Sequence, residues 1–157
     1  MKPLRILVVG YGDHQGAQPA PAARFFRGAL FRAAVAWAEA ERRQGRAANV
    51  LILSDWVGLA PCDALLYPSD DPPLAWRPGA AQDEWAAQCV AGLLGHYRGA
   101  PLLLEVHTWL PVARLLSGWS PRVWQVEVPY VGRTSPQRLA HYHRRLKLLG
   151  VTPPEGE

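Results

Sequence analysis

The sequence predicts an α/β protein with three layers: a mostly parallel sheet of about four strands with helices on both faces. Three observations predict this class. Short runs of branched aliphatic residues alternate with longer segments of helical periodicity. The clearest run, residues 50–53, contains no polar residue, as expected of a strand buried on both faces. Helical connections between such strands are typical of parallel sheets.

The first half of the chain contains two predicted strands and one long helix. Residues 4–9 are an apolar run that we interpret as the first strand. The helix is expected to begin at Pro21, because proline is tolerated in the first turn, and to end at Gly45. Residues 50–53 form the second strand. Residues 58–79 contain five prolines and little periodicity, so we expect an ordered loop with at most one short element.

The second half adds three predicted helices and two strands. Apolar periodicity predicts helices over residues 82–98 and 135–150, and a shorter one over residues 108–116. Ser135 would cap the last helix, with Pro136 at its first position. Residues 101–107 and 122–128 are the predicted third and fourth strands. The fourth alternates apolar and polar residues, which indicates a wetter face or an edge position.

The composition favours a single domain. A chain of 157 residues that is 49% hydrophobic can bury one core, so we expect residues 1–150 to form one domain and residues 151–157 a frayed tail. Cys62 and Cys89 lie in unlike surroundings, which argues against a disulfide framework or a zinc site and favours the reducing cytoplasm. No apolar stretch reaches the length of a membrane span. No motif indicates a cofactor or a metal site.

Polar residues follow the predicted strands at their carboxyl ends, where open α/β sheets bind ligands. In the first loop, the backbone at Gly12 could cradle a phosphate, and Asp13 and His14 could act as base and acid; a flexible surface loop is the alternative. After the second strand, Ser54 could donate to a ligand oxygen and Asp55 could orient a water molecule. Alternatively, Ser54 caps the following turn and Asp55 is solvated.

Two further pairs are candidates for chemistry. Glu105 and His107 point the same way on the third strand, where a carboxylate can fix the imidazole tautomer and support proton transfer. A structural pair at the rim of the core is the alternative. Asp70 and Asp71 would raise one another's pKa if both faced a pocket, although adjacent side chains often point apart.

The C-terminal segment is basic. No acidic residue lies between Val128 and Pro154. Arg133 precedes the last helix, and Arg138 and Arg145 lie near one face of it, so these cations could neutralise phosphates of a nucleotide or nucleic acid. A solvated helix face is the alternative. The formal net charge of +4 permits such contacts without requiring them.

Four motifs occur in order within residues 4–98. They are the helix segment from Phe26 to Ala34, Ile52-Leu53-Ser54 followed by Gly58-Leu59, Pro68-Ser69-Asp70, and Trp85 early in a helix. Together they resemble the YaaA-like group of α/β proteins, in particular the domain of unknown function 6884. The resemblance implies the fold, a pocket at the strand ends, and a link with nucleic acid binding and nucleobase modification. Members typically carry Cys and Lys after the first strand and Ala-Lys after the serine, where this chain has residues 11–14 and Asp55-Trp56.

Three functions follow as hypotheses. The leading one is binding of a nucleotide, nucleobase or nucleic acid at the carboxyl ends of the strands. Four residues would face the ligand: Ser54, Asp55, Asp70 and His107. Arg133 and the last helix would meet phosphate. The second is hydrolysis of an N-glycosidic bond, with Asp13 or Asp55 positioning water and His107 stabilising the leaving base. The third is a catalytically degenerate protein that binds a protein partner or a second copy of itself.

Overall fold

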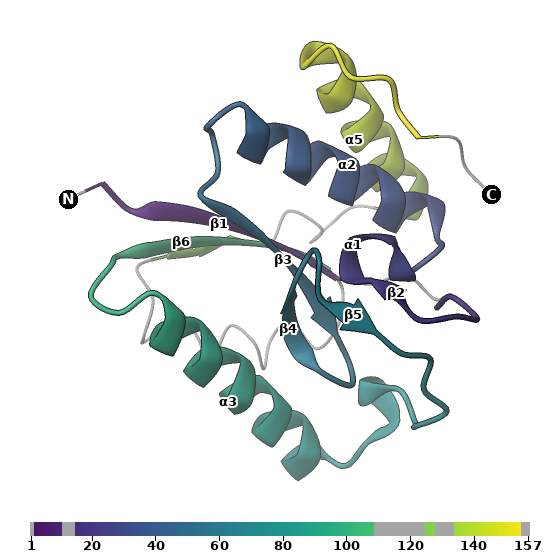
Figure 1. The fold of residues 1–157 in the computed structure, drawn as a ribbon, viewed down its shortest axis with the longest axis vertical. Helices are drawn as coiled ribbons and strands as arrows, with labels where there is room; N and C mark the ends of the chain where they lie inside the picture. Colours follow the sequence, from purple (N-terminus) through teal and green to yellow (C-terminus); the bar gives the residue numbers. More distant parts are fainter. Residues whose placement is uncertain (1, 11–14, 109–124, 128–133, 155–157) are drawn as a thin grey trace.

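The computed structural model describes residues 2–10, 15–108, 125–127 and 134–154, and its centre is a five-stranded sheet (Figure 1). The strand order is β4-β3-β1-β6-β7. These strands are β1 (Leu4–Gly10), β3 (Asn49–Ser54), β4 (Gly58–Pro61), β6 (Leu102–His107) and β7 (Gln125–Glu127). All neighbours are parallel except β4, which is antiparallel to β3. The predicted α/β class with a mostly parallel sheet is confirmed.

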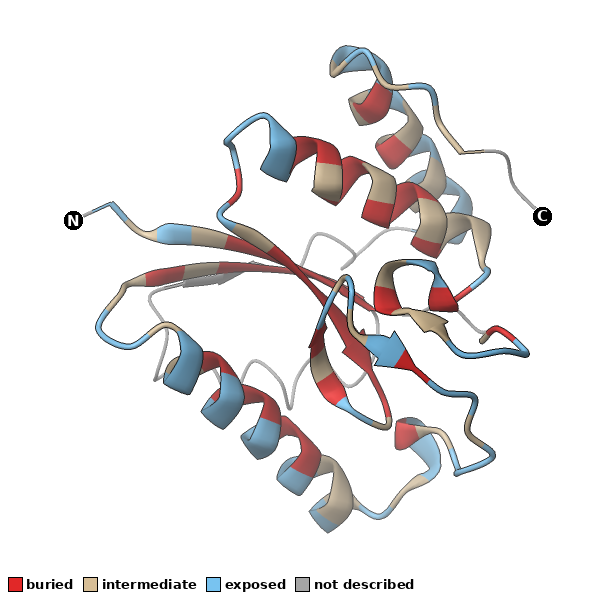
Figure 2. Ribbon diagram, in the orientation of Figure 1, coloured by how far each residue is buried: buried red, intermediate tan, exposed pale blue. Residues whose placement is uncertain are grey.

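Helices cover both faces of the sheet. On one face lies α2 (Ala29–Arg43), with α5 (Ser135–Leu148) packed beside it, and on the other lies α3 (Gly79–His96) (Figure 1). Side chains of a strand alternate between its faces, so β1 contributes Leu7 and Val9 to the core under α2, and Ile6 and Val8 to the core over α3. Buried residues consequently lie on both sides of the sheet in Figure 2. This double burial explains the uninterrupted aliphatic runs of the sequence.

The predicted helix over residues 21–45 is wrong in its first part, because the chain breaks it in two. A single turn, α1 (Ala22–Phe25), precedes an extended Phe26, and α2 begins only after Gly28. The carbonyl of Phe25 accepts a hydrogen bond from the backbone N–H of Gly16 at 2.7 Å, and Phe26 bridges Gln15. Pairing with this earlier segment, together with burial of both phenylalanine rings, favours the extended backbone over a continuous helix.

The segment 58–79 has more regular structure than predicted. Gly58 has φ +73°, which allows the tight reversal from β3 into the antiparallel β4. Further along, β5 (Leu65–Leu66) pairs with β2 (Ala20–Pro21) in a separate two-stranded sheet, and η1 (Leu74–Trp76) is a 3₁₀ turn. β4 is only four residues long, and its residues do not alternate between apolar and polar, so hydrophobic periodicity could not reveal this strand.

The remaining boundaries differ by a few residues from the prediction. α3 begins at Gly79 rather than at residue 82. The cap of α5 is Thr134, not Ser135: its side chain accepts from the Gln137 backbone N–H, and the Gln137 side chain accepts from the Thr134 N–H. The predicted helix over residues 108–116 falls almost entirely outside the described residues. No helix in the described part of the chain combines the length and apolarity needed to span a membrane.

Gly10 at the end of β1 provides a test of the packing between β1 and β6. A Cβ added at Gly10 would lie 2.2 Å from Oγ1 of Thr108 and 2.3 Å from its Cβ. We expect Gly10→Ala to lower the free energy of unfolding in urea by about 1–3 kcal/mol, because this buried contact must open. Gly92→Ala is the control: it lies in α3 where an added Cβ meets nothing within 4 Å, so it should leave stability equal or higher. Equal stability of Gly10→Ala and the unsubstituted protein would contradict this packing.

Candidate functional site

The carboxyl ends of β1, β3 and β6 lie at one edge of the sheet. Val9 of β1 pairs with Ile52 of β3 and with His107 of β6. Ser54 and His107 therefore reach the same edge, on strands separated by β1, which puts their backbones about 10 Å apart. The predicted side-by-side, parallel arrangement of these three strands is confirmed.

Ser54 and Asp55 are both buried at this edge and both make local structural contacts. Ser54 Oγ accepts hydrogen bonds from the backbone N–H of Trp56 (3.2 Å) and of Val57 (3.4 Å), as in the turn-capping alternative. Asp55 Oδ2 accepts from the backbone N–H of Leu74 at 2.8 Å, which fixes η1. Asp55 is thus neither solvated nor at the surface, contrary to the alternative that the sequence left open.

Asp70 lies apart from the buried residues, in an exposed stretch of the chain. The loop before it is held by Gln15, whose side-chain amide donates to the carbonyl of Ser69 (2.7 Å) and accepts from its N–H (3.1 Å). Asp71 is also exposed. Because Ser54, Asp55 and His107 are buried while Asp70 is exposed, these four predicted ligand contacts do not form one open surface.

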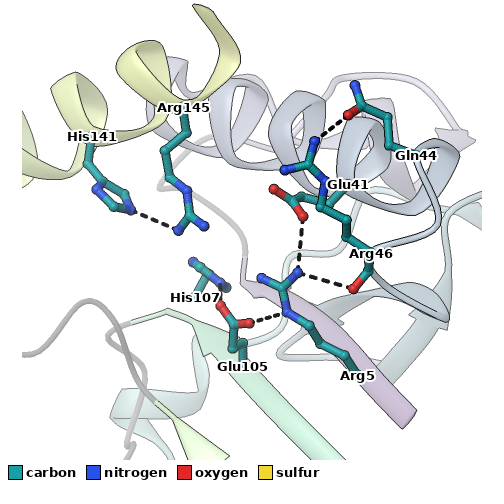
Figure 3. A network of polar contacts seen from close by, with 8 residues as sticks. All are labelled: Arg5, Glu41, Gln44, Arg46, Glu105, His107, His141 and Arg145. Carbon is teal, nitrogen blue, oxygen red and sulfur yellow. Dashed lines mark hydrogen bonds and ion pairs between the residues drawn. The ribbon is translucent and has the colours of Figure 1, made fainter. Parts of the chain in front are cut away.

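Glu105 and His107 belong to a buried polar network that joins the sheet to the helices above it (Figure 3). Glu105 Oε1 lies 3.4 Å from Nε2 of His107, and its Oε2 accepts a hydrogen bond of 2.5 Å from Nε of Arg5. Arg5 also contacts Oε2 of Glu41 on α2 at 3.0 Å. On its other side, His107 Nδ1 is hydrogen-bonded to the hydroxyl of Tyr142 on α5. The network thus connects β1, β6, α2 and α5.

Aromatic rings and a second arginine complete the surroundings of His107. The ring of Trp37 on α2 lies 4.9 Å from the imidazole, centroid to centroid. The guanidinium of Arg145 lies 4.5 Å from the Trp37 ring, close enough for a cation–π contact, and is 3.4 Å from Nε2 of His141 (Figure 3). Arg145 therefore packs over the network rather than extending from the helix, and Arg138 is half-buried.

The charges of the network set its protonation. Burial alone raises the pKa of Glu105, but hydrogen bonds from His107 and Arg5 outweigh this effect and lower the pKa to about 2. Burial lowers the pKa of His107, and the nearby charges of Arg145 and Arg5 act in the same direction, against Glu105. A neutral His107 fits its partners, with Nε2 donating to Glu105 and Nδ1 accepting from Tyr142. These contacts fit the alternative in which Glu105 and His107 are a structural pair at the rim of the core.

A second feature, which the sequence showed only in part, is a basic surface where α2 and α5 end together. The Gln44 side chain after α2 donates to the carbonyl of Leu149 after α5 at 3.4 Å. Five exposed cations lie within five residues of this contact along the chain. Arg42 lines a separate cavity with Glu39 and Cys62, and the other four are Arg43, Arg46, Arg144 and Lys147. We call these four residues the basic corner. The sequence indicated the contribution of α5, but not that of α2.

The other predicted site residues, Gly12, Asp13, His14 and Arg133, lie outside the described residues. Within the described part of the chain, no group of three His, Cys, Asp or Glu residues could hold a metal ion. Neither a protein-family model, nor a curated protein, nor a solved structure matches the chain. The resemblance to the YaaA-like group therefore stays a prediction.

The network predicts a specific acid sensitivity. Glu105 titrates near 4.5 when unfolded and near 2 when folded, so between these values the unfolded state binds more protons and stability falls as the pH is lowered. His107, with its lowered pKa, adds a loss that begins near its ordinary value of 6.5. We expect the free energy of unfolding in urea to decline below pH 6.5 and more steeply below pH 4.5, with Glu105 contributing at most about 3 kcal/mol.

Glu105→Gln separates this contribution from general acid effects. It leaves the half-buried Arg5 with one carboxylate fewer, so we expect a loss of roughly 1.5–3 kcal/mol at neutral pH and a flatter decline below pH 4.5. Glu84→Gln, on the exposed face of α3, is the matched control and should change stability by less than about 0.5 kcal/mol. If the free energy of unfolding of Glu105→Gln fell below pH 4.5 as steeply as that of the unsubstituted protein, Glu105 would not be the source of this acid sensitivity.

Proposed function

We propose that this chain binds nucleic acid through phosphate contacts at the basic corner. The observation that carries the proposal is the joining of exposed cations from two helices at one place, through the contact between Gln44 and Leu149. No acidic residue occurs in residues 42–48 or 134–154. The nearest carboxylates on α2 are Glu39 and Glu41, and Glu41 is paired with Arg5. Clustered lysine and arginine side chains on one surface are the usual electrostatic footprint of a nucleic-acid contact.

The helix dipoles account for only part of this charge. The carboxyl end of each helix carries the equivalent of roughly −0.5 elementary charge, so two adjacent ends attract about one cation's worth of positive charge. The basic corner has four arginine and lysine side chains. Most of its positive charge is therefore directed to solvent, where a polyanion can meet it.

The form of the surface favours a polymer over a single nucleotide. A mononucleotide needs donors that converge in a pocket, whereas the cations of the basic corner are exposed side chains. None of the four lines either of the two described cavities. Exposed cations suit the repeated phosphates of a nucleic-acid backbone, which are bound with little sequence preference.

The residues first considered for this role take different parts in the proposal. Arg145 stacks on Trp37 and contacts His141, so we assign it to positioning α5 rather than to phosphate. Ser54, Asp55 and His107 are buried in local contacts, and we do not extend the proposal to hydrolysis of a glycosidic bond. The protein-partner hypothesis stays a prediction.

Salt-dependent binding tests the proposal. Arg43→Gln combined with Lys147→Gln should weaken binding to labelled single- and double-stranded DNA and RNA, measured by fluorescence anisotropy over a range of salt concentrations. Removing two phosphate contacts should lower the slope of log affinity against log salt by about 1.5–2. The control, Arg24→Gln with Arg98→Gln, removes two exposed cations elsewhere and should leave the slope nearly unchanged. Equal losses in both double variants, or no binding at about 50 mM salt, would refute the proposal.

A further inference from the structure

A cavity of about 420 Å³ lies between α3 and the strands β3 and β4. The core under α3 uses the opposite face of the sheet from α2 and α5, so the cavity is separated from the basic corner by the sheet itself (Figure 1). Its volume is in the range of pockets that bind small organic molecules. Its lining includes the aromatic rings of Trp56, Trp85 and Tyr97, and also His96, which precedes Tyr97 in the chain.

The walls of this cavity carry almost no charge. No carboxylate, lysine or arginine is among its described lining residues, and His96 is the one histidine among them. The thiol of Cys89 also lines the cavity, and burial raises its pKa to about 12, so it stays neutral and is a poor nucleophile. A charged ligand would lose its hydration here without gaining an opposite charge, which favours an uncharged one.

The aromatic walls are held in place before any ligand arrives. Trp85 Nε1 donates to the carbonyl of Ser54 at 3.1 Å, and Trp56 Nε1 donates to the carbonyl of Asp71 at 3.4 Å. Both indole N–H groups are thus used by the protein. Trp85 belongs to the core under α3 and Trp56 is half-buried, and each ring contributes to the cavity lining. Fixed aromatic side chains bind flat rings at a low entropic cost, because little freedom is lost on binding.

Polar groups at the cavity can orient such a ring. Asn49 Nδ2 donates to the hydroxyl oxygen of Tyr97 at 2.8 Å, while Asn49 Oδ1 accepts from the backbone of Val50. The hydroxyl hydrogen of Tyr97 is then available to a ligand acceptor. Gln88 on α3 also lines the cavity and offers both a donor and an acceptor.

We propose that this cavity binds an uncharged, planar heteroaromatic molecule of one or two rings, stacked against the aromatic walls and hydrogen-bonded to Tyr97 or Gln88. We assign the site to binding rather than to thiol chemistry, because its one thiol is protonated. It is a second site, and it depends on none of the residues of the basic corner.

Two glycines of α3 make a matched pair for the test. A Cβ added at Gly92 or at Gly95 meets nothing within 4 Å, so leucine can be accommodated at either position. Gly92 lines the cavity and Gly95 does not. Gly92→Leu therefore adds a side chain at the wall of the cavity, while Gly95→Leu makes the same change on the same helix beside it. Both should be at least as stable as the unsubstituted protein, because leucine is the better helix former.

The measurement is a titration with indole and with adenine, followed by the NMR signals of the Gln88 side-chain amide and the indole N–H groups of Trp56 and Trp85. We expect saturable shifts at these signals in the unsubstituted protein and in Gly95→Leu, and at least a tenfold loss of affinity in Gly92→Leu. Indole-3-acetate should bind more weakly than indole, because its carboxylate finds no partner. Nucleic-acid binding in Gly92→Leu should be unchanged, so failure at one site can be told from failure at the other.

The opposite results would overturn the proposal. These are the absence of saturable shifts at Gln88, Trp56 and Trp85 with both indole and adenine up to their solubility limits, or equal affinity in Gly92→Leu and Gly95→Leu. Tighter binding of indole-3-acetate than of indole would contradict the uncharged character of the ligand.

Discussion

The ion pair between Arg5 and Glu105 is the interaction on which the arrangement of the layers depends. Arg5 comes from β1, and its side chain also reaches Glu41 on α2 and the carbonyl of Arg46 after it. Glu105 uses one oxygen for Arg5 and the other for His107, which continues to Tyr142 on α5. Each of these groups is expensive to bury without its neighbour. The positions of α2 and α5 over the sheet are therefore determined by polar contacts as well as by apolar packing.

The same network explains how the carboxyl ends of α2 and α5, which are far apart in the sequence, come together. Tyr142 and Leu146 are buried in the core that α2 covers, which places α5 along α2. Gln44 then meets the carbonyl of Leu149, and the cations on either side of this contact gather. The basic surface is thus a consequence of how α5 is positioned, and its charge would be spread over separate places if the two helices ended apart.

The sequence predicted the parts of the fold that follow from local pattern. Aliphatic runs identified β1, β3 and β6 because both faces of these strands are buried, and the spacing of Glu105 and His107 identified a pair because alternate residues share a face. The break at Phe26 and the edge strand β4 were missed, since each depends on a partner elsewhere in the chain. Arg5 was missed for the same reason: it lies 100 residues from Glu105. Asp55 shows a further limit, because a polar residue after a buried strand has the same sequence signature whether it meets a ligand or supports a turn.

The short strand β4 determines how the sheet ends on that side. It is four residues long, runs against the direction of its neighbour and finishes at the exposed Pro61, which has no N–H to donate. A foreign strand would find little backbone to pair with there, whereas a longer edge of aliphatic residues such as those of β3 would be an open template. β4 therefore shields the aggregation-prone centre of the molecule, and concentrated protein should resist growth into fibrils from this edge.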